Sequence, residues 1–127
     1  ERLIQPREKR LVKAIQQVNG RVKLHICGDI THLLPGIADL GVDVLDVDHM
    51  VSLRAAREAV GGAVVITGNM DPVAVIRNGT PDGIRAAVRR AWEEAGNPYM
   101  VNAGCEIPSG TPPGNLRALC EPVPYRP

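Results

Sequence analysis

One short β-strand pattern organises the chain around it: Arg21-Val-Lys-Leu-His-Ile-Cys-Gly-Asp29. Apolar and polar residues alternate through Cys27, as expected of a half-buried strand, and Gly28 ends the run. On the carboxyl side, apolar runs at about residues 42–47, 63–67 and 99–102 predict three more strands. The third of these is expected to break at Gly68-Asn69.

Helical segments flank and separate these strands. In residues 6–18, Leu11, Ile15 and Val18 share one face at spacings of four and three, and Asn19-Gly20 is expected to end the helix. Further helices are predicted at about residues 31–39, 53–60, 81–95 and 112–119. The result is one helix followed by four βα units, which indicates parallel strands with helical crossovers.

Two architectures satisfy that order: an open doubly wound sheet and a (β/α)₈ barrel. The chain has neither a GxGxxG sequence nor a P-loop, which removes the usual phosphate-binding arguments for the open sheet. A complete barrel needs about 250 residues. We therefore predict an α/β fold in which the 127 residues form one partial domain, half of a (β/α)₈ TIM barrel.

Composition excludes several classes of protein. Lys and Arg number 15 against 14 acidic residues, which gives no strong electrostatic drive toward nucleic acid or an anionic membrane. No apolar run approaches the roughly 18 residues of a spanning helix. The chain shows no signal-peptide pattern, so a cytoplasmic location is expected. Three scattered cysteines are no disulfide framework and indicate free thiols or a metal site.

Reactive side chains follow every predicted strand. In parallel α/β folds, active sites are built at the carboxyl ends of the strands. The four groups, in strand order, are His25, Cys27, Gly28 and Asp29; Asp46, Asp48 and His49; Gly68, Asn69 and Asp71; and Asn102, Gly104, Cys105 and Glu106.

His25 and Cys27 form the sharpest of these patterns. Residues i and i+2 of a strand point to the same face, so an imidazole and a thiol could hold one ion. Cys105, at the end of a later strand, would be the third ligand. A His/Cys/Cys set favours zinc, and three protein ligands leave a fourth position open, as in catalytic zinc sites. The alternative is a buried cysteine beside a core histidine; the strand-end position of Cys105 favours the metal.

Other candidates each carry a structural alternative. One of Asp46 and Asp48 could be a fourth zinc ligand or an acceptor for the imidazole, or could bind loop amides. Asn69 and Asp71 could position a substrate, although Asn and Asp before a proline more often mark a cap or turn. His49 is equally well explained as a rim residue or a base.

Some conspicuous residues are expected to be structural. His32 should lie on a helix surface, and Cys120 should be a small core residue of the last helix. Arg85, Arg89 and Arg90 are expected to form a solvated helix face.

Three longer motifs resemble the uroporphyrinogen decarboxylase superfamily, and within it the methylcobalamin:coenzyme M methyltransferases. They are Leu24-His-Ile-Cys-Gly-Asp29; Gly68-Asn-Met-Asp-Pro-Val73 with Asn78-Gly-Thr-Pro81; and Gly104-Cys-Glu-Ile-Pro-Ser-Gly-Thr-Pro-Pro113 with Asn115-Leu116. The resemblance extends from about residue 5 to 121. It implies the carboxyl-terminal half of a (β/α)₈ barrel, starting in the helix before the fifth strand, with the amino-terminal half absent.

The branches of this superfamily differ at the metal positions. The decarboxylases use no metal and carry Gly-His-Gly where Gly104-Cys105-Glu106 stands here. In the methyltransferases, the HxC pair and the late cysteine hold zinc, which implies His25, Cys27 and Cys105. Cobalamin-independent methionine synthase is similar, and its acidic ligand points to Asp48. One departure is Gly114, where Glu is common in the family.

The resemblance implies a zinc-dependent methyltransferase that moves a methyl group from methylcobalamin, or from a corrinoid protein, to a small thiol. The acceptor is coenzyme M in archaeal relatives. Asp48, Asn69 and Asp71 are the predicted catalytic residues. The alternatives are a uroporphyrinogen decarboxylase and an inactive truncated barrel. Half a barrel should expose two strand edges and an apolar inner face, so a homodimer or a missing amino-terminal half is expected as partner.

Overall fold

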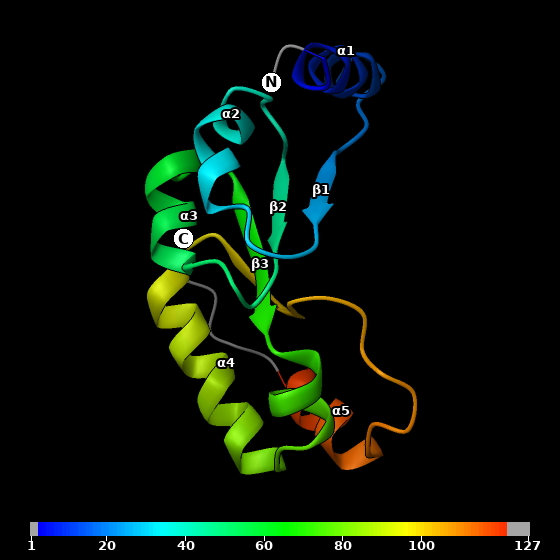
Figure 1. Cartoon of the computed structure of the whole chain (residues 1–127), viewed down its shortest axis with the longest axis vertical. Coiled ribbons are helices and arrows are strands. Elements are labelled where there is room, and N and C mark those ends of the chain that lie inside the picture. Colours follow the sequence, from blue (N-terminus) through cyan, green and yellow to red (C-terminus); the bar gives the residue numbers. More distant parts are fainter. Residues whose placement is uncertain (1–2, 122–127) are drawn as a thin grey trace.

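A computed structural model of the chain describes residues 3–121 and shows alternating helices and strands (Figure 1). In chain order the elements are α1 (Gln5–Gln16), β1 (Lys23–Ile26), a 3₁₀ turn (Thr31–Leu33) leading into α2 (Leu34–Ala38), β2 (Val44–Val47), α3 (Leu53–Val60), β3 (Val65–Met70), a π-helical turn (Pro72–Arg77), α4 (Pro81–Ala95), β4 (Tyr99–Ala103) and α5 (Pro113–Leu119).

The four strands form one parallel sheet in the order β1-β2-β3-β4, which confirms the predicted topology. The register aligns one row across the sheet: His25 with Asp46, Asp46 with Thr67, and Thr67 with Met100. Because all strands run the same way, their carboxyl ends and the loops that follow them meet at one edge of the sheet.

The core lies on one side of this sheet. Figure 1 shows α2, α3 and α4 stacked along that side of the strands. Alternate apolar residues of the strands pack against the buried faces of these helices. The main buried cluster includes Leu34, Ile37, Leu45, Val47, Leu53, Ala56, Ile66, Ala91 and Ala95. A second cluster at the carboxyl ends joins Met70, Ile76, Ile84, Val88 and Leu119, which fixes the π-helical turn and α5.

The opposite face of the sheet is largely polar, so the expected apolar inner face is wrong. Lys23 and His25 alternate with the core residues of β1, and Asp46 and Thr67 take the matching positions in β2 and β3. Lys23 Nζ lies 2.6 Å from Asp46 Oδ2, and Asn102 Nδ2 donates to the same oxygen at 3.2 Å. The alternation in β1 already indicated a polar face, because Lys23 and His25 are two residues apart and therefore lie on the same side of the strand.

Two further expectations from the sequence are wrong. Gly68-Asn69 does not break β3: Gly68 pairs with Val47 of β2 and Val101 of β4, and Asn69 pairs with Asn102 of β4. Cys120 is exposed, not a core residue. The buried side of α5 consists of Asn115, Ala118 and Leu119, and Cys120 follows them on another side.

Capping contacts mark the starts of α3 and α4. Ser52 Oγ accepts a hydrogen bond from the Ala55 N–H at 3.2 Å, and Thr80 Oγ1 accepts one from the Gly83 N–H at 3.2 Å. Asn19, after α1, has a left-handed φ of 59°. The apolar spacing that includes Leu11 predicted α1, but this side of the helix is not the buried one. Leu11 is 63% exposed, whereas Val12 is only 4% exposed. Among residues 3–121, no helix is both long enough and apolar enough to cross a membrane.

Candidate metal site

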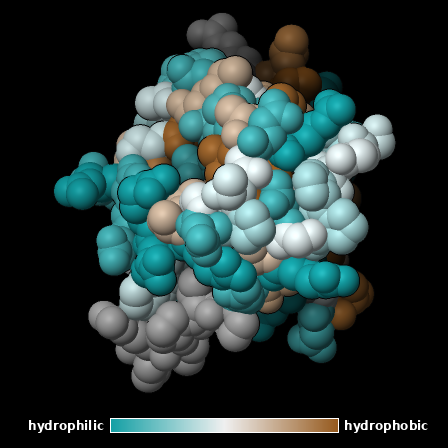
Figure 2. Space-filling model, turned by 90° about the horizontal axis from the view of Figure 1, so that it is seen from below, coloured by the Kyte–Doolittle hydropathy of each residue, from teal (hydrophilic) through white to brown (hydrophobic). Residues whose placement is uncertain are grey.

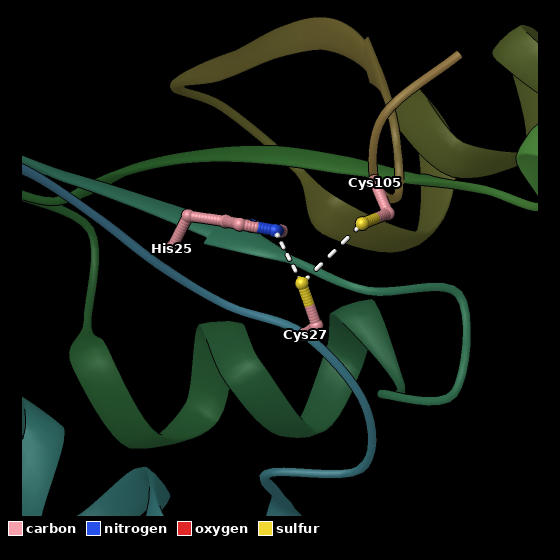
Figure 3. Close-up of side chains that lie close together, drawn as sticks. All are labelled: His25, Cys27 and Cys105. Atoms are coloured by element: carbon pink, nitrogen blue, oxygen red, sulfur yellow. Dashed lines mark hydrogen bonds between the residues drawn. The ribbon is translucent and has the colours of Figure 1, made fainter. Parts of the chain in front are cut away.

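The structure brings His25, Cys27 and Cys105 together, as Figure 3 shows. The Cys27 sulfur lies 3.3 Å from His25 Nε2 and 3.3 Å from the Cys105 sulfur, although the two cysteines are 78 residues apart. One ligand atom from each residue falls within 4.8 Å of the others. Within residues 3–121, no other group of three or more His, Cys, Asp or Glu residues meets this criterion.

Strand geometry orients the first two side chains. His25 lies in β1 and Cys27 directly follows it, so period-2 alternation sends both to the open face. His25 Nδ1 lies 3.1 Å from the carbonyl oxygen of Asp46. Since a carbonyl can only accept, the neutral ring carries its proton on Nδ1 and presents the lone pair of Nε2 to the thiols. A main-chain acceptor on the far nitrogen is the usual orienting contact of a metal-binding histidine.

The two thiols differ in acidity because of their mutual contacts. Contacts with His25 and Cys27, together with the Glu106 N–H, lower the pKa of Cys105 below the ordinary thiol value. The contact with Cys105 raises the pKa of Cys27. Burial lowers the pKa of His25, but contacts with Cys105 and the Asp46 carbonyl outweigh it and raise this pKa. Cys105 is therefore the first of the two thiols to become a thiolate, the form that binds metal.

This donor set fits zinc. Zinc bonds of about 2.0–2.3 Å in a tetrahedron put neighbouring ligand atoms about 3.5–3.8 Å apart. The two separations of 3.3 Å are a few tenths of an ångström shorter. One imidazole nitrogen and two sulfurs also form the soft set that zinc prefers over magnesium or calcium.

Asp48 is engaged by N–H donors. Its Oδ2 accepts from the Gly28 N–H at 2.6 Å, and its Oδ1 lies 2.6 Å from both the backbone nitrogen and Nδ1 of His49. Burial raises the pKa of Asp48, but these hydrogen bonds outweigh it and the net pKa is lowered. The carboxylate thus ties the residue after Cys27 to the loop after β2, as the loop-amide alternative predicted. Its role as a fourth ligand stays a prediction.

Asn69 and Asp71 also have structural partners. Asn69 Nδ2 donates to the Val51 carbonyl oxygen at 2.6 Å. Asp71 Oδ1 accepts from the N–H groups of Val73 and Ala74 and so caps the π-helical turn. The hydrogen bond from Ala74 is the largest cause of its lowered pKa. Asp71 Oδ2 also lies 3.7 Å from His49 Nε2, so His49 sits between Asp48 and Asp71.

Several contacts near the site could not be anticipated from the sequence. The Asp46 carbonyl orients His25, whereas the Asp46 carboxylate binds Lys23 and Asn102. Only the position of Lys23 could have been predicted: it lies two residues before His25 in the strand and therefore on the same face.

Residues expected to be structural are on the surface. His32, Arg89 and Arg90 are exposed, and Arg85 pairs with Asp82 and Glu121. Figure 2 views the molecule from the end toward which the strands of Figure 1 point. Hydrophilic residues predominate on this surface, and hydrophobic residues occupy smaller areas. The metal-site candidate therefore belongs to a largely polar end of the molecule.

Parallel βα units with an imidazole and two thiols at the strand ends define a barrel-type α/β protein with a candidate metal site. The chain belongs to the uroporphyrinogen decarboxylase (URO-D) family, whose match covers residues 1–124. This confirms the family resemblance and, with the fold, the α/β partial-barrel prediction.

Its relatives include both methyltransferases and decarboxylases. The methylcobamide:CoM methyltransferase MtbA of Methanosarcina mazei is 35% identical over 121 residues, which are 95% of this chain and 35% of that protein. A uroporphyrinogen decarboxylase of Ralstonia nicotianae is 39% identical over 95 residues, 71% of this chain and 26% of that protein.

A solved structure shows the same arrangement. A methyltransferase from Methanosarcina mazei superposes with a TM-score of 0.79 at 28% identity, over 93% of this chain and 34% of that one. The chain thus spans about a quarter to a third of the length of these proteins.

Proposed function

We propose that the protein is a zinc-dependent methyltransferase that moves a methyl group from methylcobalamin, or from a corrinoid protein, to a small thiol. The observation that carries this is the meeting of His25 Nε2 and the two sulfurs within 4.8 Å. Similarity to a protein named methylcobamide:CoM methyltransferase supports the choice of methyl donor and thiol acceptor. A cytoplasmic location suits a site that needs reduced thiols.

His25, Cys27 and Cys105 would hold the zinc ion. Bound zinc would supply a Lewis acid that favours the thiolate form of an acceptor at neutral pH. The chain prepares this site by fixing the His25 ring through the Asp46 carbonyl and by lowering the pKa of Cys105. Both effects reduce the reorganisation that metal binding requires.

We assign Asp48, Asn69 and Asp71 to the surroundings of the acceptor. Asp48 braces the residue after Cys27, and Asp71 lies against the His49 ring. In the overall reaction the methyl group passes from cobalt to sulfur while the acceptor thiol loses its proton. His49, between two carboxylates, is suited to receive that proton.

Two other functions compete with this one. The 39% identity to a uroporphyrinogen decarboxylase favours tetrapyrrole decarboxylation as the second candidate. That chemistry gives no role to two thiols 3.3 Å apart. The third possibility is an inactive partial barrel. Two turnover assays distinguish the three functions: methyl transfer from methylcobalamin to coenzyme M, and decarboxylation of uroporphyrinogen. An inactive partial barrel would show neither activity.

Metal analysis of wild type and three Cys→Ser variants tests the proposal. We expect about one zinc per chain in the wild type and much less in Cys27→Ser and Cys105→Ser, because each loses one of three ligands. Cys120→Ser is the matched control, since Cys120 is exposed and lies outside the cluster. Full zinc retention by both Cys27→Ser and Cys105→Ser would rule out this metal site.

A further inference from the structure

The two cysteines of the site come from strands that are not neighbours. Cys27 follows β1 and Cys105 follows β4, and β2 and β3 lie between them. Three steps of about 4.8 Å would separate these strands by about 14 Å in a flat sheet. The sulfurs are nevertheless 3.3 Å apart. The sheet is therefore not flat, and the segment after β4 reaches the loop after β2.

Gly104 makes the contact that brings this segment in. Its N–H donates to the Met70 carbonyl oxygen at 2.7 Å. A Cβ atom on Gly104 would lie 2.6 Å from the backbone nitrogen of His49, 3.2 Å from the Asp48 carbonyl carbon and 3.3 Å from that of Asn69. These are main-chain atoms, which cannot rotate away as a side chain can. The glycine is required for space, since its φ is not in the left-handed region.

The loop after β2 also receives the other cysteine segment. Asp48 Oδ2 accepts from the N–H of Gly28, next to Cys27, at 2.6 Å. Gly104, next to Cys105, packs on the backbone of Asp48 and His49. The loop after β2 contains none of His25, Cys27 and Cys105. Its contacts with the residues next to the two cysteines nevertheless set the distance between the two sulfurs.

We propose that Gly104 is a positioning residue whose missing side chain lets Cys105 reach Cys27 and His25. This inference rests on the proposed zinc site for its metal readout. Any side chain at position 104 must push the backbone of Cys105 away from the loop after β2. Zinc–ligand distances normally lie within about 0.2 Å of their usual values, so a shift of the Cys105 backbone should weaken the third bond.

The test compares Gly104→Ala with Gly79→Ala in the full chain. Gly79 is the matched control because its Cβ would lie 2.1 Å from the Val75 carbonyl oxygen, a backbone clash in another segment that is closer than the 2.6 Å at Gly104. Zinc affinity, measured by competition with a chromophoric chelator, should fall at least about 10-fold in Gly104→Ala. Gly79→Ala should lose stability but keep wild-type zinc affinity.

A second readout does not depend on zinc. In metal-free protein carrying Cys120→Ser, diamide should oxidise Cys27 and Cys105 to a disulfide while the diazene is reduced to the hydrazine. Gly104→Ala should slow this step several-fold, as followed by mass spectrometry of the linked peptides. If the wild type binds no zinc but the slowing occurs, the proposed function fails and the positioning role stands.

Unchanged disulfide formation in Gly104→Ala would overturn the inference, whatever its zinc affinity. Circular dichroism checks folding, and a destabilised variant is measured in trimethylamine N-oxide, which favours the compact state. A Gly104→Ala chain that stays unfolded there would also overturn the inference, because the contact would then be a general requirement of the fold.

Discussion

Asp43, far from the thiols, shows how one carboxylate joins three segments. Its Oδ1 lies 2.7 Å from Arg21 Nη1, and its Oδ2 accepts from the Val22 N–H at 2.9 Å and from Gln16 Nε2 at 3.2 Å. The hydrogen bond with Arg21 is the largest of the effects that lower the pKa of Asp43 to about 2. The ionised side chain thus links the end of α1 to the starts of β1 and β2.

This pKa predicts an acid-dependent stability. The folded-state pKa lies below the unfolded value, so the contribution of Asp43 is complete above about pH 4 and is lost as the pH falls toward 2. Asp43→Asn should therefore lower the free energy of unfolding at pH 6 in urea titrations. The gap between variant and wild type should narrow steadily between pH 4 and pH 2.

Asp39→Asn provides the control for this prediction. Asp39 is an exposed carboxylate that follows α2, so its removal should leave the free energy of unfolding within about 0.5 kcal/mol at every pH. A constant difference between Asp43→Asn and wild type from pH 6 to pH 2 would contradict a role for the ionised carboxylate.

The meeting of the three candidate ligand residues could be predicted from the sequence, but their supporting contacts could not. Period-2 alternation places His25 and Cys27 on one face, and strand order places Cys105 at the same edge. The orientation of the His25 ring depends on the Asp46 carbonyl. A carbonyl is present at every residue, so no side-chain pattern marks the one that accepts.

Between elements, Arg57 of α3 makes the densest set of contacts to main-chain carbonyls. Its guanidinium donates to four of them at 2.7–2.8 Å: those of Gly61, Val64, Ala95 and Pro98. These carbonyls belong to the ends of α3 and α4 and to the segments entering β3 and β4. One side chain thus closes the amino-terminal end of the sheet.

Arg57→Lys should destabilise the protein although it keeps the charge. A single ammonium cannot reach four carbonyls spread over the planar fork of a guanidinium, so some lose their donor. We expect a loss of about 2 kcal/mol in the free energy of unfolding, measured in urea. Arg54→Lys, an exposed position on the same helix, should change it by less than about 0.5 kcal/mol. Equal small effects of both variants would argue against a bridging role.

The elements themselves were predicted where local signals and packing agree. Ser52 and Thr80 mark the starts of α3 and α4, and the apolar stripe of α4 is buried as its spacing indicates. The π-helical turn Pro72–Arg77 was not predicted. It depends on the Asp71 cap and on burial of Ile76 against α4 and α5, and the second of these is a tertiary contact.

At the scale of the whole molecule, the sequence predicted the topology of the sheet but not the polarity of the face away from the helices. Order and spacing of the βα units determine a parallel sheet in chain order, as observed. The face away from the helices is largely polar, with Lys23, Asp46 and Thr67 on it, and Met100 is an apolar residue of the same face. A barrel interior can use polar residues when they satisfy one another, which general rules about covered parallel sheets do not capture.

This open face leads to a prediction about association. In residues 3–121, β1 and β4 are the edges of the sheet, and each leaves one side of its backbone without a strand partner. We expect the 127-residue chain to associate at micromolar concentration, as a dimer in sedimentation experiments. Parallel sheets are rarely stable with one bare face and two bare edges, so pairing across them lowers the free energy.

Two lysine substitutions locate the surface that associates. Met100 is 57% exposed and belongs to the row of the open face, whereas Val73 is 48% exposed on the π-helical turn. Met100→Lys should weaken dimerisation at least about 10-fold, equivalent to about 1.4 kcal/mol, because association would bury an ammonium group. Val73→Lys should leave the dissociation constant unchanged. A wild-type chain that sediments as a stable monomer at these concentrations would contradict the prediction, and equal effects of the two variants would place the contact elsewhere.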